Sequence, residues 1–529
     1  MDMPRVERET DVLIIGTGLA GLRAAIEARR FGQRVLLVDK ALIGINNNTA
    51  LAGGGIKGAL PTILDTSVEK QYDTPDQHFE DTVEYGEYMG DQSLVETMAL
   101  EGPGRILELR EWNIPHFEAL CTYGMEKPIE LADGSTAVDA NPARGGQVVT
   151  NGLTAECKRL GVKTLVGCHL LGLLTSDEGV VGAFLYNIFN GKVIVCRAAS
   201  TILATGGAGE LYRINYTTNV TTGDGYAVAH RIGAELIGME FTQFSPHTMM
   251  EPGLPMWYLL PCEARLHAVY RNGKGETFLD EVLNPTGEVT ANFQRRYGEL
   301  STDVREVISR AIAAEIFAGR GDGDSIWLDF REVPEEYWQS DLPSRYNLRC
   351  LVRDFDWKKK PIRISPGALT HLGGIAINTS TETNIPGLYA VGEAAAPVHG
   401  SRRRGGNAFT ECVVFGARAG RVGAEYARAN SKIAGEFDKE AVDARLSDVA
   451  AWDQPATPEG EPASIRAEIQ RTMWENSGPL RTQERLETCL SDLKALRRDR
   501  MPHLYANTPF EVKAAAEMES LLEVGEIVA

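Results

Sequence analysis

The sequence has few cysteines, and their spacing does not suit an iron–sulfur cluster or a zinc ion. Its eight cysteines are scattered over 529 residues, and no two form a C-x-x-C pair. The histidines show no metal-ligand spacing either, so we expect no bound metal. We interpret the cysteines as buried thiols of a protein in a reducing compartment.

Long apolar runs and an excess of positive charge are also missing. No stretch approaches the roughly 20 apolar residues that a membrane helix needs, so no membrane insertion is expected. The charged N-terminus lacks the apolar core of a signal peptide, which predicts a cytoplasmic protein. The net charge of −19 argues against a nucleic-acid partner, because the phosphates would be repelled.

The N-terminal segment has the pattern of a dinucleotide-binding βαβ unit. An apolar strand, Val12–Ile15, leads into Gly16, Gly18 and Gly21, and an Ala-rich helix and a second strand follow. The first glycine allows a tight turn, the second lets the backbone approach a pyrophosphate, and the third lets helix and strand pack closely. Asp39 ends the second strand, where an acid can accept hydrogen bonds from ribose hydroxyls.

Two later segments repeat the strand-and-glycine pattern. Strand-like runs, the last of them at 192–196, lead into a separate apolar strand that ends in Thr205-Gly206-Gly207. A third strand ends in Gly392-Glu393 after an aromatic-rich and proline-rich stretch that we interpret as an inserted domain. A chain that returns to its sheet after a long insertion can hold an extended cofactor, which favours FAD over NAD.

Several segments together match one known family. They are Ile14–Gly21, Ala204–Gly207, Thr222–Gly225, Pro386–Glu393, Val398–Gly400, Gly405–Ala408 and Val413–Gly420. On these motifs the chain resembles the flavoprotein subunits of fumarate reductase and succinate dehydrogenase, together with L-aspartate oxidase and soluble fumarate reductases.

The resemblance implies an α/β fold class, with a Rossmann-like FAD-binding domain, an inserted α+β capping domain and a C-terminal helical domain. The boundaries we expect are 1–240 and 366–435 for the two parts of the FAD-binding domain, 241–365 for the capping domain and 436–529 for the helices. Active sites in this family lie between the flavin and the cap.

The resemblance and the glycine motifs together give a set of FAD-binding residues. Asp224 and Glu393 are expected to bind the sugar portions of FAD, and Gly406 and Asn407 to back its ring system. The full set is Gly16, Gly18, Leu19, Ala20, Asp39, Lys40, Thr49, Gly54, Gly55, Ala204, Thr205, Gly206, Asp224, Gly392, Glu393, Gly406, Asn407 and Ala408.

The chain departs from the family where respiratory members carry a histidine linked covalently to the flavin. Alignment on Thr49 and the Gly54-Gly55 pair puts Asn48 at that position. Asparagine has no nucleophilic ring nitrogen, so FAD is expected to bind noncovalently. A noncovalent flavin usually has a lower potential than a linked one, which favours reduction of the substrate.

The histidines that hold dicarboxylates in the family are also replaced. Ser245 and Leu369 occupy their aligned positions, while His247 and His371 each lie two residues further on. Whether these two histidines take over the missing contacts is open. Glu263 aligns with a residue that grips a carboxylate. Loss of two charge-assisted bonds, at about 1.5–3 kcal/mol each, predicts that neither fumarate nor succinate is the substrate.

Two arginines match the catalytic arginines of the family. Arg305 aligns with the proton donor, and because arginine stays protonated it needs a nearby carboxylate, Glu306 or Glu263, to move a proton. Arg403 aligns with the residue that binds and polarises a substrate carboxylate or carbonyl. It is the middle one of three adjacent arginines, which favours an anionic substrate.

These features predict an FAD-dependent oxidoreductase that acts on CH–CH or C=C groups. It would transfer a hydride between flavin N5 and a carbon next to a carboxylate or carbonyl. Two alternatives stay open: a sulfur-compound flavoenzyme of the adenylylsulfate-reductase kind, and a flavin-bearing electron-transfer subunit. Electrons would come from an iron–sulfur partner or another donor, and either homo-oligomers or hetero-oligomers are compatible with the sequence.

Overall fold

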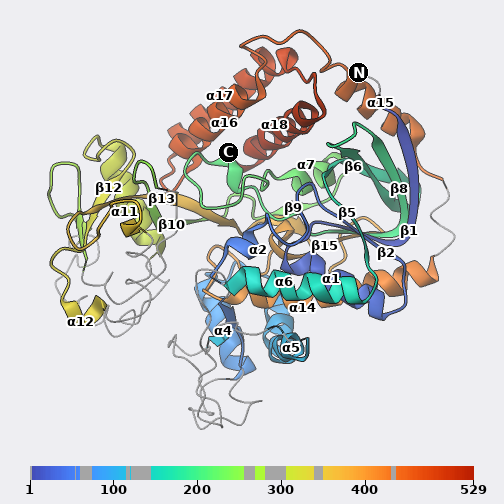
Figure 1. Cartoon of the computed structure of the whole chain (residues 1–529), viewed down its shortest axis with the longest axis horizontal. Coiled ribbons are helices and arrows are strands. Elements are labelled where there is room, and N and C mark those ends of the chain that lie inside the picture. The colour runs from blue at the N-terminus through green and yellow to red at the C-terminus, as the bar shows by residue number, and fades with distance from the viewer. Residues whose placement is uncertain are drawn as a thin grey trace.

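The computed structural model describes residues 3–53, 55–59, 74–112, 114, 119–120, 145–254, 256, 268–279, 305–338, 350–430 and 436–529. Figure 1 shows a large twisted sheet with helices beneath it, a smaller unit of strands and helices at one side, and a group of C-terminal helices above. This arrangement confirms the predicted α/β fold class with an inserted unit and a helical C-terminal part.

The large sheet has seven strands in the order β5-β2-β1-β8-β7-β6, and β15 also pairs with β8. Strands β5, β2, β1, β8 and β15 pair in parallel, whereas β7 pairs antiparallel with β8 and with β6. Their bounds are β1 Arg5–Ile15, β2 Val35–Val38, β5 Lys163–Leu165, β6 Cys168–Ser176, β7 Gly179–Asn187, β8 Val193–Leu203 and β15 Leu388–Ala390. The two separate runs expected around 192–204 are therefore one long strand, which pairs with β1 along its whole length.

Small residues let two helices pack tightly beneath the sheet. Helix α1 (Leu19–Arg30) lies against α14 (Asn407–Ala429). A Cβ at Gly416 would lie 2.7 Å from the Ala20 carbonyl oxygen, and one at Gly420 would lie 2.4 Å from that of Ala24. The neighbouring helices are α4 (Pro75–Tyr85), α5 (Gln92–Glu111) and α6 (Gly145–Arg159).

Short elements connect these layers. They are α2 Asn48–Leu51, β3 Ile56–Lys57, β4 Ala119–Leu120, η1 Gly209–Leu211, α7 Asp224–Arg231, β9 Leu236–Ile237, β14 Gly374–Ala376, η3 Gly392–Ala394 and β16 Ala395–Ala396.

The inserted unit is a four-stranded sheet in the order β10-β13-β12-β11 with helix α11 packed on β10 and β13. Its elements are β10 Thr242–Met249, β11 Val269–Arg271, α11 Arg305–Phe317, β12 Ile326–Asp329, α12 Glu335–Trp338 and β13 Ile362–His371. Strand β13 runs through the boundary that we propose at 365/366, so the inserted unit and the large sheet unit share a continuous strand at that point.

The C-terminal part consists of α15 Lys439–Ala450, α16 Pro462–Ser477, α17 Gln483–Asp499, η4 Met501–His503 and α18 Pro509–Val528. The helical pattern expected over 465–497 is divided into two helices because Gly478 and Pro479 interrupt it. Among the described residues, no helix combines the length and the apolar character that a membrane crossing requires. The described cysteines are free thiols.

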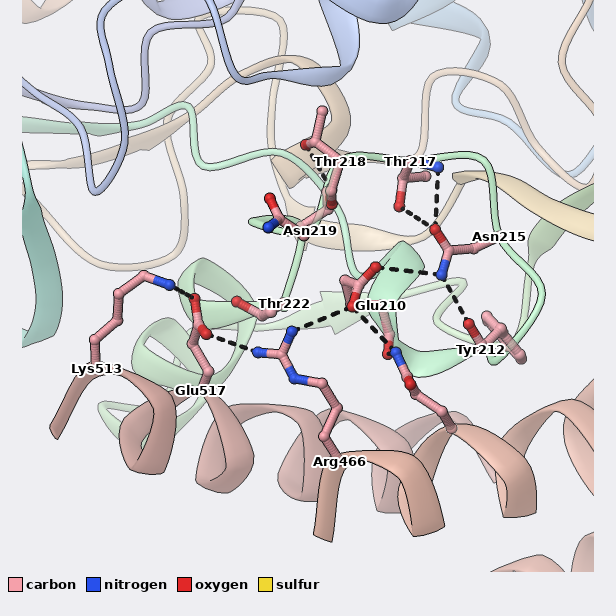
Figure 2. A network of polar contacts seen from close by, with 12 residues as sticks. Glu210, Tyr212, Asn215, Thr217, Thr218, Asn219, Thr222, Arg466, Lys513 and Glu517 are labelled. Atoms are coloured by element: carbon pink, nitrogen blue, oxygen red, sulfur yellow. Dashed lines mark hydrogen bonds and ion pairs between the residues drawn. The ribbon is translucent and has the colours of Figure 1, made fainter. Parts of the chain in front are cut away.

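A buried network of ions fastens the C-terminal helices to the rest of the chain (Figure 2). Its centre is Glu517 of α18, which accepts hydrogen bonds from Lys40 at 2.8 Å, Lys513 at 2.8 Å and Arg466 at 2.7 Å. Arg466 of α16 also contacts Glu210 in η1 at 3.3 Å. Burial alone would raise the pKa of Glu517, but these three cations outweigh it and hold the pKa well below its usual range.

We predict that Glu517→Gln lowers the free energy of unfolding by about 3–5 kcal/mol at pH 7, because it leaves buried cations without their shared anion. A carboxylate whose folded-state pKa is depressed stabilises the fold above its unfolded pKa, near 4.5, and loses this effect as the pH falls further. The difference between wild type and variant should therefore narrow below about pH 4.5.

Urea unfolding at several pH values measures both effects. Glu526→Gln on the same helix is the control, because its partner Arg497 is 48% exposed and such a pair contributes only about 0–1 kcal/mol. Equal losses in the two variants would contradict the assigned role of Glu517.

Candidate active site

Three loops that carry predicted FAD-binding residues meet at one edge of the large sheet. The last residue of β1, Ile15, pairs with the last residue of β8, Leu203, which in turn pairs with the last residue of β15, Ala390. The turns that begin at Gly16, Ala204 and Val391 therefore start level with one another. In open parallel sheets, ligands bind outside the carboxyl ends of the strands, at such an edge.

The first turn has the geometry that a pyrophosphate requires. Gly16 has φ +111°, and a Cβ there would lie 2.0 Å from the Ala204 carbonyl oxygen. Gly18 caps α1 without any side-chain hydrogen bond, so the helix start keeps backbone N–H groups for an anion. The Leu19 N–H is an exception, because it donates to Thr49 Oγ1 at 3.1 Å.

The two later turns and the start of α14 also have room for a cofactor. Gly206 and Gly392 have φ +74° and +63°, and the buried Thr205 hydroxyl has no hydrogen-bond partner among the described residues. Gly406 has φ +84° and caps the N-terminus of α14, again without a side-chain hydrogen bond. Glycine turns, an unpartnered hydroxyl and two uncapped helix ends around one sheet edge fit an extended, anionic cofactor such as FAD.

The acid at the end of β2 is buried and held by local donors. Asp39 accepts hydrogen bonds from the Thr17 N–H at 2.9 Å, the Thr17 hydroxyl at 2.5 Å and the Ala41 N–H at 2.7 Å. Burial raises the pKa of Asp39, although these hydrogen bonds favour the charged form. The neighbouring Lys40 donates to Thr222 and Asp224 at 2.6 Å each.

The cluster of His169, Asp224 and Glu517, next to Lys40, has to be tested as a possible metal site. Ligand atoms of these three residues all lie within 4.8 Å of one another, which is a spacing that a metal ion could use. The Lys40 ammonium, however, already contacts both carboxylates, at 2.6 and 2.8 Å. It supplies the positive charge at that point, so we assign the cluster to the ion network and not to a metal.

The three adjacent arginines of the loop before α14 have different partners. Arg402 pairs with Glu87 at 3.0 Å, and Arg404 pairs with Asp81 of α4 at 2.5 Å. Arg403 donates to the Arg404 carbonyl oxygen at 3.0 Å. Burial raises the pKa of Glu393, a proposed FAD-binding residue, and the charge of Arg403 partly opposes this rise.

Helix α4 holds this loop with one face. His78, Asp81 and Thr82 are spaced i, i+3 and i+4, so they project together. His78 Nε2 lies 2.9 Å from Asn407 Oδ1, and the Asn407 Nδ2 donates to the Thr82 hydroxyl at 2.9 Å. Burial lowers the pKa of His78 to about 4, so the ring is neutral at pH 7. The side chain of Asn407 thus fixes the start of α14 against α4.

A buried glutamine links the arginine loop to the inserted unit. The Gln243 Nε2 of β10 donates to the Arg403 carbonyl oxygen and to Glu306 Oε1, at 3.0 Å each. Glu306 lies in the first turn of α11, directly after the buried Arg305. One side chain therefore links the two segments that carry the arginines proposed from the sequence.

The two candidate histidines are in different surroundings. The backbone N–H of His371 donates to Glu393 Oε1 at 2.9 Å, and the ring Nε2 of His371 lies 3.4 Å from the Thr242 hydroxyl. Burial and the Arg481 charge lower the pKa of His371 to about 4, so it is neutral. His247 instead lies against Tyr270 of β11, with Nε2 2.5 Å from the phenol oxygen. His371 thus contacts a proposed FAD-binding residue, Glu393.

For four of the predicted site residues the structure gives little or no evidence about their role. Gly54 and Glu263 lie outside the described residues, while Gly55 and Ala408 flank β3 and the start of α14. Sequence reasoning missed Gln243, Thr242 and the α4 face. The i, i+3, i+4 spacing of polar residues on α4 could have predicted that this face makes polar contacts. The sequence around Gln243 contains no pattern that predicts its two partners.

Comparison with known proteins identifies the family. Residues 11–409 match the model of the FAD binding domain, and residues 466–529 match that of the fumarate reductase flavoprotein C-terminal part. The chain belongs to the succinate dehydrogenase and fumarate reductase family of flavoproteins. It is an FAD-dependent oxidoreductase, and its relatives act on CH–CH groups.

Two relatives show the extent of the similarity. A fumarate reductase (CoM/CoB) subunit of Methanothermobacter marburgensis is 33% identical, over 92% of this chain and 85% of its own. The mitochondrial succinate dehydrogenase [ubiquinone] flavoprotein subunit of Oryza sativa is 30% identical, over 91% and 76%.

Solved structures agree. E. coli quinol fumarate reductase FrdA has a TM-score of 0.81 at 26% identity, with 99% of this chain and 89% of that chain covered. Mycobacterium smegmatis Sdh1 has a TM-score of 0.82 at 29% identity, with 99% and 86% covered. An adenosine-5-phosphosulfate reductase shares the fold, with a TM-score of 0.74 at 18% identity over 99% and 89%.

We predict that Gly16→Ala yields a protein that does not retain FAD. The new Cβ would overlap the Ala204 carbonyl oxygen and force the first two turns apart. Gly32→Ala is a matched control, because Gly32 also has a positive φ, +86°, but nothing lies within 4 Å of the position that its Cβ would take. The control should cost about 1–2 kcal/mol and keep its flavin. The ratio of flavin to protein absorbance in the purified variants measures the result.

Proposed function

We propose that the protein reduces or oxidises a carbon–carbon bond next to a carboxylate or carbonyl, in substrates other than fumarate and succinate, with noncovalently bound FAD. The observation that carries this proposal is the Gln243 bridge, which joins the Arg403 loop to the first turn of α11. It supports a site in which Arg403 and Arg305 act on one substrate from different sides.

Each group of residues around the sheet edge suits a different part of FAD. The Gly18 turn would hold the pyrophosphate, Glu393 a sugar hydroxyl, and the start of α14 at Gly406 the ring system. FAD, when bound, supplies the two-electron chemistry at the substrate carbon. Asn48 gives no covalent attachment point, so the cofactor is held by these contacts alone.

The two arginines would have different roles, substrate binding for Arg403 and proton transfer for Arg305. Arg403 would bind a substrate oxygen through its planar guanidinium and draw electron density from the adjacent carbon–carbon bond. Arg305 would deliver or accept a proton at the neighbouring carbon. Because arginine is otherwise always protonated, it needs a carboxylate beside it. Glu306 is suited to this role, because its Oε2 is buried and has no hydrogen-bond partner among the described residues.

The far end of the substrate would meet few charges from β10 and β13. Ser245 is buried, with a hydroxyl that has no hydrogen-bond partner among the described residues, and Leu369 is apolar. A second carboxylate placed there would lose its water without gaining a cationic partner. This supports a monocarboxylate or a carbonyl compound in place of a C4 dicarboxylate.

The electron donor is proposed from the relatives. Several are named as subunits, among them the CoM/CoB fumarate reductase protein and succinate dehydrogenase flavoprotein subunits. We therefore infer that an iron–sulfur or other electron-carrying subunit works with this chain. Slow bleaching of the flavin by free NADH, together with rapid bleaching by reduced viologen, would support this inference.

We predict that Arg403→Ala and Arg305→Ala each lower kcat by about 10²–10⁴-fold while FAD stays bound. Arg402→Ala is the matched control for the first, because Arg402 pairs with the half-exposed Glu87. The control should retain most of its activity. Stopped-flow oxidation of reduced enzyme by a substrate found in a screen of enones and unsaturated acids gives the rates. An Arg403→Ala enzyme with more than about a tenth of wild-type activity would disprove the role of Arg403.

We also predict that fumarate and succinate are poor substrates. Both aligned histidines are absent, and a site built for other contacts rejects a dianion because its oxygens stay unpaired. Steady-state assays with reduced viologen and fumarate test this directly. A kcat/KM of roughly 10⁴ M⁻¹s⁻¹ or more would return the protein to the dicarboxylate enzymes. Sulfur oxyanions in the same screen test the alternative of a sulfur-compound reductase.

A further inference from the structure

Asn48 is aligned with the flavin-linking histidine of respiratory relatives, and both ends of its amide make hydrogen bonds. Its Nδ2 donates to Glu393 Oε2 at 3.0 Å. Its Oδ1 accepts from the Thr218 N–H at 3.0 Å and lies 3.4 Å from the hydroxyls of Thr218 and Thr221. An amide can serve both partners at once because it has a donor at one end and an acceptor at the other.

Glu393, the carboxylate proposed to bind FAD, is held from two sides. Asn48 contacts one oxygen, and the His371 N–H donates to the other at 2.9 Å. Gly207 leaves the space for this carboxylate, since a Cβ there would lie 2.5 Å from Glu393 Oε1. Without the Asn48 donor, a buried carboxylate would lose one of its hydrogen bonds, the others coming from His371 and Thr370.

The other side of the Asn48 amide contacts a loop that is held by its own hydrogen bonds. Asn215, which begins this loop, donates to Glu210 Oε1 at 3.3 Å and to the Tyr212 carbonyl oxygen at 2.8 Å. It also accepts from the Thr217 N–H at 3.1 Å. Figure 2 shows that the loop with Thr218 lies beside Glu210, whose carboxylate contacts Arg466 of the C-terminal helices. Asn48 thus ties Glu393 to a segment that is itself anchored.

We propose that Asn48 is a positioning residue for FAD binding: its amide orients the Glu393 carboxylate toward the cofactor by holding it against the loop at Thr218. The residue at the position of the linking histidine would then hold a carboxylate by hydrogen bonds instead of forming a covalent link. This inference rests on the proposed role of Glu393 in the FAD site.

The test is Asn48→Asp, which keeps the shape of the side chain and the acceptor for Thr218 but replaces the donor with an oxygen. At pH 8 two carboxylates would then face each other at about 3.0 Å. The dissociation constant for FAD, measured by quenching of flavin fluorescence on the apoprotein, should rise roughly 10-fold to 100-fold. Asn46→Asp is the matched control, because Asn46 has a single exposed contact, to Asn219 at 3.3 Å.

Two further measurements separate positioning from general damage. Lowering the pH to 5.5 should restore most of the affinity of Asn48→Asp, because one proton can bridge the two carboxylates. The groups that face Glu393 are Arg403, which favours its charged form, the Tyr226 and Cys412 side chains, whose pKa it raises, and the neutral His371. The double variant Asn48→Asp with Glu393→Gln should bind FAD more tightly than Asn48→Asp at pH 8, because the glutamine amide supplies the missing donor.

The outcomes are distinct. An Asn48→Asp affinity within twofold of wild type at pH 8 would overturn the inference, and so would a large loss that neither low pH nor the double variant restores. If the wild-type apoprotein itself bound no FAD, or if acid precipitation left flavin attached to the protein, the proposed noncovalent FAD site would fail instead.

Discussion

The rest of the molecule depends on one constraint: the parallel strands β1, β8 and β15 end opposite one another. Because β8 pairs with β1 on one side and β15 on the other, with Leu203 opposite both Ile15 and Ala390, three turns from distant parts of the chain start at one edge. A shift of one residue would turn every buried side chain of a strand to the other face, so the apolar pattern of these strands fixes the register. The location that we propose for the cofactor follows from that alignment.

The inserted unit meets the sheet edge through the first two residues of β10. Thr242 pairs with His371 at the end of β13, and the His371 backbone N–H donates to Glu393. Gln243 then reaches the Arg403 loop and α11. A few buried polar contacts at this junction set the relative positions of groups that the inserted unit and the large sheet contribute. Such contacts are directional, and leaving either partner unsatisfied is costly.

Sequence patterns predict local backbone geometry best. The turns at Gly16 and Gly392 could be predicted because glycines that directly follow an apolar strand are typical of phosphate-binding turns, whereas the role of Gly406 at the start of α14 was expected only from the family resemblance. The single strand β8 was predicted as two runs because Arg197 interrupts its apolar pattern, and pairing with β1 on one side and β7 on the other overrides that interruption. The partners of Arg402 and Arg404 could not be predicted, since opposite charges at long sequence separation carry no local signal. The substrate contacts of His371 and His247 stay predictions for the same reason.

The anchoring of Lys40 has a consequence for the order in which the protein is made. Lys40 leaves the ribosome early, yet its partner Glu517 lies 477 residues later. Until α18 has been synthesised, the buried ends of Lys40 and Arg466 lack their common anion, and the sheet edge next to Asp39 is not yet closed by helices. Contacts of such long sequence separation form late in folding. The ion network around Lys40 is therefore complete only after α18 has been synthesised.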